Sequence, residues 1–201
     1  MLILVIIWEA ISKFGVFPAF MWPPLIIPND PGGVTIFKTL IDGIISGRLI
    51  EATATSLGRL IVGYILAVVI GLALGFFIYK YKLVDDTLGF FVTALQSVPN
   101  IVWFPLAILW FGLGVSSVIF IVVLGASLTI TITSSSGFKS VSPLHIRVAK
   151  TMGSSGFHLF RTIIFPSSIP QLIAGLRLAW GLAWRGVLAG ELLGGSGGLG
   201  T

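Results

Sequence analysis

Residues 60–79 read LIVGYILAVVIGLALGFFIY, twenty positions without a charged side chain. A helix needs about 20 apolar residues to cross the ~30 Å hydrocarbon core of a bilayer, so this stretch predicts one membrane span. A second uncharged stretch, Thr87–Phe138, is long enough for two spans. Because unpaired backbone amides are costly in lipid and these runs lack a period of two, we expect helices rather than a barrel.

The composition of the whole chain is also that of a membrane protein. Of its 201 residues, 56% are hydrophobic and 9% are charged, whereas soluble domains carry about 25% charged residues. We predict an all-α integral membrane protein, a polytopic helix bundle forming a single domain over residues 1–201. Its five helices are expected near Leu2–Phe20, Thr53–Tyr79, Asp86–Trp110, Ser117–Ser136 and Ser168–Gly190. The first, which contains Glu9 and Lys13, is expected to be a retained helix rather than a signal peptide.

The lysine and arginine residues outside the spans indicate the orientation in the membrane. Two loops on one side hold six of them: Lys80, Lys82, Lys139, Arg147, Lys150 and Arg161. The other side holds Lys38 and Arg48, so we expect the six-residue side to be cytoplasmic. This bias accounts for the net charge of +5, and no nucleic-acid partner is implied. The chain has no cysteine, which excludes disulfides and thiolate metal sites, and no metal site is predicted.

The basic loop between the last two predicted spans reads VSPLHIRVAKTMGSSGFHLFRTIIFP over residues 141–166. Ser142 followed by Pro143 is typical of a helix start, and Leu144, Val148 and Met152 recur on one helical face. Gly153 can end that helix in a left-handed conformation. A second short helix carries Phe157, and Pro166 and Pro170 are expected to break the chain before it re-enters the membrane.

Two readings of this loop are open. A basic amphipathic segment can lie on anionic lipid headgroups, with Arg147, Lys150 and Arg161 facing phosphate. However, a helix that lies on lipid gains nothing from being cut in half by a glycine. A compact pair of helices suits insertion into a groove on a protein partner.

The loop resembles the cytoplasmic loop of permease subunits in binding-protein-dependent ABC importers. The family pattern is E-A-A-x-x-x-G followed, after nine residues, by I-x-L-P. This chain has Arg147-Val148-Ala149, Gly153, Ile163 and Phe165-Pro166 at the same spacing. Further stretches are similar to the branch that serves nitrate, sulfonates and taurine, among them Ser56-Leu57-Gly58-Arg59, PLAILWFGLG from Pro105, and Ala183 through Glu191.

The resemblance implies a type I importer fold with six helices per subunit, one more than we predict for this chain. It also implies a permease homodimer, two ATPase subunits that bind ATP and magnesium, and an external substrate-binding protein. The chain itself contains no G-x-x-x-x-G-K-[ST] loop, so no bound cofactor is expected, and it is not predicted to be an enzyme. The expected coupling residues are Arg147, Val148, Ala149, Gly153, Phe157, Arg161 and Pro166.

Charges and prolines within the spans suggest a translocation path. Pro99 and Pro105 are expected to kink or unwind the third helix, and such breaks can line a cavity. Arg185 is placed in the outer third of the membrane, where it either borders the path of an anionic or zwitterionic solute or reaches the outer headgroups. Glu191 is grouped with this path, whereas Arg59 and Arg177, near span ends, are expected to extend to the headgroups.

The small residues predict where helices approach closely. Gly71-x-x-x-Gly75 and Gly186-x-x-x-Gly190 permit tight backbone contact, and packing within one subunit is the favoured interpretation. The alternative function, a secondary transporter or channel that is not coupled to ATP, would be expected to carry carboxylates at mid-membrane. No Asp or Glu occurs between Thr87 and Gly190, which favours the permease.

Overall fold

The computed structural model describes residues 2–14, 23–25, 35–194 and 197–200, and the regular structure in those ranges is helical. The chain divides into two compact units, residues 1–54 and 55–201, with the boundary inside α3. The first unit contains α1 (Leu2–Lys13) and α2 (Ile36–Ile45). Glu9, the carboxylate within α1, accepts a hydrogen bond from the backbone N–H of Leu25 (2.9 Å). Helix α2 was not predicted, and residues 15–20 of the first predicted helix lie outside the described residues.

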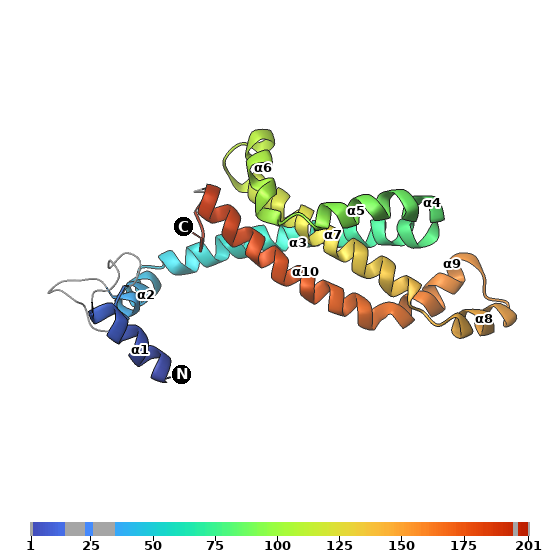
Figure 1. The fold of residues 1–201 in the computed structure, drawn as a ribbon, viewed down its shortest axis with the longest axis horizontal. Coiled ribbons are helices and arrows are strands. Elements are labelled where there is room, and N and C mark those ends of the chain that lie inside the picture. The colour runs from blue at the N-terminus through green and yellow to red at the C-terminus, as the bar shows by residue number, and fades with distance from the viewer. Residues whose placement is uncertain (1, 15–22, 26–34, 195–196, 201) are drawn as a thin grey trace. The chain divides into compact units, whose positions relative to one another are not determined.

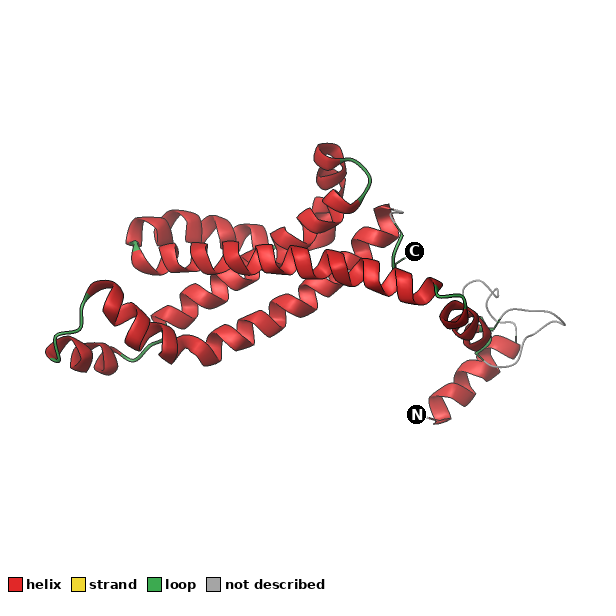
Figure 2. Cartoon of the chain, turned by 180° about the vertical axis from the view of Figure 1, so that it is seen from behind, coloured by secondary structure: helices red, strands yellow, loops and turns green. Residues whose placement is uncertain are grey.

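The second unit is organised by three long helices, which confirm three of the predicted spans. They are α3 (Arg48–Lys80), α7 (Val115–Lys139) and α10 (Phe165–Gly194) (Figure 1). Over the described residues, three helices are long and apolar enough to cross a membrane, or four if one bent pair is counted as a span. Figure 2 shows from behind that short loops join the helices of this unit.

Helix α7 lies at the centre of the core, between α3 and α10. The core contains nine buried apolar residues: Leu60 and Ala67 of α3, Val118, Val122, Ala126 and Ile130 of α7, and Ala179, Ala183 and Val187 of α10. Because α7 is buried on several sides, its own hydroxyl groups are satisfied locally; Thr131, for example, donates to the carbonyl of Ser127 (2.7 Å). Such local bonds let a polar side chain stay in an apolar interior.

The glycines of α3 make this close packing possible. A Cβ atom on Gly71 would lie 2.7 Å from the Cβ of Ile130, and one on Gly75 would overlap the hydroxyl of Ser134. On α10, a Cβ on Gly190 would lie 3.1 Å from Val118, whereas Gly186 has ordinary spacing to its neighbours. The predicted small-residue contacts therefore join helices of the same chain through α7.

The third predicted helix, Asp86–Trp110, is wrong as a single element. The chain forms α4 (Lys82–Val84), a π-helical turn (Asp85–Gly89) and α5 (Phe90–Gln96), then a 3-10 turn (Asn100–Trp103) and α6 (Phe104–Phe111). The two halves are bent by 97°. The break coincides with Pro99, which lacks an N–H and disfavours helical geometry at the residue before it. The predicted kink at Pro99 is confirmed, but Pro105 lies in the first turn of α6, where proline is tolerated.

The basic loop forms two short helices around a glycine turn, as predicted. These are α8 (Pro143–Thr151) and α9 (Gly156–Leu159), and Gly153 and Gly156 have φ of +88° and +55°. The predicted break at Pro166 and Pro170 is wrong, because the chain stays helical from Gly156 to Gly194. A π-helical turn over Phe160–Ile164 precedes Pro166. This turn shifts the backbone hydrogen-bonding pattern just before Pro166, which itself has no N–H to contribute, and Pro170 lies inside α10.

Candidate functional site

The base of the basic loop is anchored to the long helices by buried apolar side chains. The cluster contains Phe138, Val141, Ala149, Leu159, Ile164 and Leu172. The ring of Phe160 packs beside it, with centroid distances of 4.7 Å to Phe76 and 5.3 Å to Phe138. Ala149 was expected on the contact surface, and that expectation is wrong: its side chain is 6% exposed and belongs to this anchor. Position 149 lies about 100° around the helix axis from Val148, on a different face of α8 from the exposed side chains.

The outer face of the loop presents apolar side chains to the surroundings. Leu144, Val148, Met152 and Phe157 are 64%, 50%, 82% and 70% exposed. We call these four residues, with Gly153 between them, the docking surface. A Cβ atom on Gly153 would meet nothing within 4 Å, so the turn is open on that side. Arg147, Lys150, Arg161 and Pro166 are exposed as well. Exposed apolar side chains that gather on one loop suggest an interaction site.

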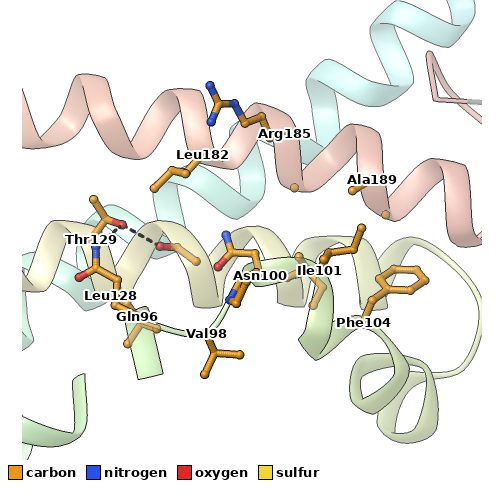
Figure 3. A pocket seen from close by; sticks show the side chains of 15 residues that line it. Gln96, Val98, Asn100, Ile101, Phe104, Leu128, Thr129, Leu182, Arg185 and Ala189 are labelled. Carbon is orange, nitrogen blue, oxygen red and sulfur yellow. Dashed lines mark hydrogen bonds between the residues drawn. The ribbon is translucent and has the colours of Figure 1, made fainter. Parts of the chain in front are cut away.

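A cavity of about 530 Å³ lies in the second unit beside the bend at Pro99. It is lined by residues from the bent segment, from α7 and from α10, among them Pro99, Asn100, Gly125, Thr129, Arg185 and Gly190. Figure 3 shows Asn100 between the bend and α7, and Leu182 and Ala189 on α10 across from it. Of the residues predicted for the translocation path, Pro99 and Arg185 line this cavity, whereas Pro105 and Glu191 do not.

The polar groups of this cavity come from three elements. The side-chain amide of Asn100 lies directly over Gly125, where a Cβ atom would overlap it. Gln96 donates a long hydrogen bond to the hydroxyl of Thr129 (3.4 Å), and that hydroxyl donates to the carbonyl of Gly125 (3.1 Å). Arg185 is exposed, and in Figure 3 its guanidinium points away from Asn100. The cavity thus has neutral amides inside and a cation at its edge.

Glu191 lies on another face of α10, in a buried ion pair that was not predicted. Its carboxylate is fully buried and accepts hydrogen bonds from the guanidinium of Arg59 (2.7 Å) and the hydroxyl of Ser56 (2.8 Å). The backbone N–H of Gly200 also donates to it (3.1 Å), and Arg59 donates to the carbonyl of Gly197 (2.5 Å). The expectation that Arg59 extends to the headgroups is therefore wrong, since it is 6% exposed.

The sequence carries a signal for the pairing of Arg59 with Glu191. Arg59 and Glu191 are opposite charges that each interrupt an apolar stretch, and such charges are costly in a membrane unless they are paired. Arg177, another charged residue of α10, is exposed, and its predicted approach to the headgroups stays a prediction. Over the described residues, no group of three or more His, Cys, Asp or Glu side chains is arranged to hold a metal ion.

A family comparison decides the class of protein. Residues 67–201 match the model of the family described as binding-protein-dependent transport system inner membrane component. The chain belongs to this family. It is a permease component of an ABC transporter, and its relatives are named as permease components rather than as enzymes.

Individual relatives agree with this assignment. The permease is 34% identical over 190 residues to a putative ABC transporter permease of Methanocaldococcus jannaschii, covering 94% of this chain and 69% of the relative. It is 30% identical over 198 residues to a putative aliphatic sulfonates transport permease of Bacillus subtilis, covering 98% of this chain and 69% of that one.

A solved structure shares the fold of the permease. The inward-facing MetNI methionine ABC transporter matches with a TM-score of 0.66 over 76% of both chains, at 20% sequence identity. The predicted all-helical, multi-pass architecture of the type I importer kind is confirmed by this likeness and by the three long apolar helices. The predicted membership of the importer permease family is confirmed as well.

Proposed function

We propose that the chain is the membrane subunit of an ATP-driven importer and that an ATPase subunit binds the docking surface. The observation that carries the proposal is the exposure of Leu144, Val148, Met152 and Phe157 on a loop whose base is firmly packed. A rigid base with an apolar outer face suits a partner that must both bind the loop and push it. ATP and magnesium would be held by that partner.

The continuous helix supplies a route for the push. It runs from Gly156 to Gly194, 39 residues, or about 58 Å at 1.5 Å per residue. One end carries Phe157 of the docking surface, and Arg185 and Gly190 near the other end line the cavity. Movement of the docking surface would therefore shift the α10 wall of the cavity. Glu191, which does not line the cavity, would hold that part of α10 to α3, and Pro99 would set the bend that carries Asn100.

The assembly follows from the family and from the charges. We infer a homodimer of this permease with two ATPase subunits and an external binding protein, placed in the cell's inner or plasma membrane. The docking surface would face the cytoplasm, because its neighbours Arg147, Lys150 and Arg161 obey the positive-inside rule. The solute would be small and anionic or zwitterionic, for example nitrate, taurine or another sulfonate, in line with the sulfonate relative and with the cation at the cavity edge.

Two alternatives lead to different expectations. A secondary transporter or channel would use the same helices without an ATPase, and the family membership disfavours it. A lipid-lying loop would place the exposed apolar residues in the headgroup region. The left-handed Gly153 turns α8 away from α9, and this turn favours a protein groove over a flat lipid surface.

The test is co-purification of the ATPase subunit encoded with this permease. Gly153→Trp puts a bulky ring in the middle of the docking surface and should abolish co-purification. Gly112→Trp is the matched control, because Gly112 also has a positive φ (+74°) and open space around its Cβ position but lies between α6 and α7. Equal yields of ATPase with both variants, each still folded by size-exclusion chromatography, would refute docking at this surface.

A further inference from the structure

The cavity beside the Pro99 bend has a one-sided charge. Among the described residues that line it, Arg185 is the charged side chain, and the polar side chains are Gln96, Asn100 and Thr129. Apolar groups such as Ile101, Phe104 and Leu182 form much of the rest of the wall. A largely apolar cavity with a few convergent polar groups is the usual form of a small-molecule site, and 530 Å³ lies within the common range.

The bend and the glycine at position 125 together fix the position of the Asn100 amide. The 97° bend ends α5 at Gln96 and restarts the chain at Asn100, so that both amide side chains lie at the break. Gly125 has no side chain at the point where the amide of Asn100 lies, and a Cβ there would overlap its nitrogen. A neutral amide offers both donors and an acceptor without the desolvation cost of a buried charge.

We propose that this cavity is an oxoanion site on the translocation path, with short-chain alkanesulfonates as the ligand class. Arg185 at the edge selects the sign of the charge, and Asn100 and Gln96 donate hydrogen bonds to sulfonate oxygens inside. Ile101 and Leu182 contact the alkyl chain. The inference rests on the proposed function, because it assumes that a solute passes between α10 and the bend.

One cation together with neutral hydrogen-bond donors suits a site that binds a transported solute weakly. A solute in transit must enter readily and leave readily, so its site must not bind it too tightly. A single arginine at the edge raises the local concentration of anions in an apolar cleft by about tenfold or more. The amides then replace the water that the oxygens lose, and they leave no charge behind to hold the anion in place.

Residues 1–201 contain no cysteine, so a thiol introduced there can be assigned by mass spectrometry of the permease subunit after purification with its partner subunits. Ala189→Cys, on the cavity wall, provides one thiol. Its modification rates are measured with two methanethiosulfonates, one carrying an anionic sulfonatoethyl group and one a cationic trimethylammonioethyl group. Leu178→Cys is the control, because Leu178 is 63% exposed on the same helix and does not line the cavity.

We expect the anion-to-cation rate ratio to be about tenfold higher at position 189 than at position 178. Arg185→Gln should remove this difference, and Arg185→Lys should keep it. Equal ratios at the two positions, or a ratio at position 189 that does not respond to Arg185→Gln, would overturn the assignment of Arg185. This readout does not involve ATPase binding, so its failure is distinguishable from failure of the proposed function.

The amide contribution is measured by protection. Millimolar ethanesulfonate should slow modification of Ala189→Cys, whereas ethyltrimethylammonium should not. Asn100→Ala should weaken that protection several-fold and leave the anion-to-cation ratio nearly unchanged. Gly125→Ala should have the same effect, because its Cβ displaces the amide of Asn100. Protection that is unchanged in both variants would overturn the role of Asn100, and no protection in the parent would overturn the site.

Discussion

Two ion pairs of identical length hold the second unit together at different places and in opposite surroundings. Arg59 and Glu191 join α3 to α10 at 2.7 Å with side chains 5% and 0% exposed. Lys139 and Asp85 join α7 to the π-helical turn, also at 2.7 Å, with side chains 44% and 37% exposed. The difference teaches that distance alone says little about how much an ion pair matters.

The solvent exposure of each ion pair determines how much the pair contributes to the stability of the fold. Taking two charges out of water is costly, and the cost is offset only when the geometry is good and the remaining hydrogen bonds are made. Glu191 meets this condition through Ser56 and the backbone of Gly200. The exposed pair loses little solvation and gains little, because water and salt screen its attraction.

The largest effect is expected when one member of the buried pair is removed. Glu191→Ala leaves the guanidinium of Arg59 buried without its carboxylate, which typically costs 3–5 kcal/mol. Thermal unfolding of the purified permease, followed by loss of the monodisperse peak on size-exclusion chromatography, should show a large drop in stability. Asp86→Asn, an exposed carboxylate elsewhere in the same unit, is the control and should be close to wild type.

Replacing both members tests whether the charges themselves are needed for the fold. Arg59→Met combined with Glu191→Leu removes the uncompensated charge and should recover most of the stability lost in Glu191→Ala. If the double variant is as unstable as the single one, the hydrogen bonds that Glu191 accepts from Ser56 and Gly200 contribute more to stability than the pairing of charges. In that case the contrast between the two ion pairs would rest on the hydrogen bonds around Glu191 rather than on charge.

An intermediate effect is expected from Ser56. Its hydroxyl donates to the Glu191 carboxylate and accepts from the backbone N–H of Leu199 (2.9 Å). Ser56→Ala leaves that N–H and part of the carboxylate without a partner, at a cost of about 1–3 kcal/mol. Gly58→Ala, where the added Cβ meets nothing within 4 Å, is a control on the same helix. If the two variants unfold at the same temperature, the hydrogen bonds of Ser56 to Glu191 and Leu199 do not contribute to stability.

The sequence predicts features that depend on neighbouring residues better than contacts between distant ones. Long uncharged runs predicted α3 and α7, a largely apolar stretch predicted α10, and the Pro99 break and the Gly153 turn followed from backbone chemistry that acts within a few residues. The Arg59–Glu191 pair joins positions 132 residues apart, and only helix packing brings them together. The inward face of Ala149 and the unbroken helix through Pro166 were missed for the same reason, since each depends on neighbours that are distant in sequence or on a π-helical turn.

The predicted path residues show the limit of this reasoning most clearly. Arg185 and Glu191 are six positions apart on one helix, and both were grouped with the path because each is a charge in an apolar span. Their separation of six residues already puts them on different faces of a helix, and the structure shows what each face meets: the cavity for Arg185, and the core against α3 for Glu191. Charge identifies a residue that needs an explanation, but the helix face on which it lies decides what that explanation is.

The smallest effect is expected at the exposed pair. Lys139→Gln removes the ammonium that donates to Asp85 (2.7 Å), and an exposed pair of this kind contributes about 0–1 kcal/mol. The loss measured at low ionic strength should disappear in 1 M salt, where the screening length falls to about 3 Å. The effect of Glu191→Ala should persist in the same salt, because its partner is shielded from solvent. A salt-independent loss of several kcal/mol for Lys139→Gln would mean that the junction of α7 with the π-helical turn is held as tightly as that of α3 with α10, and that exposure does not separate the two pairs.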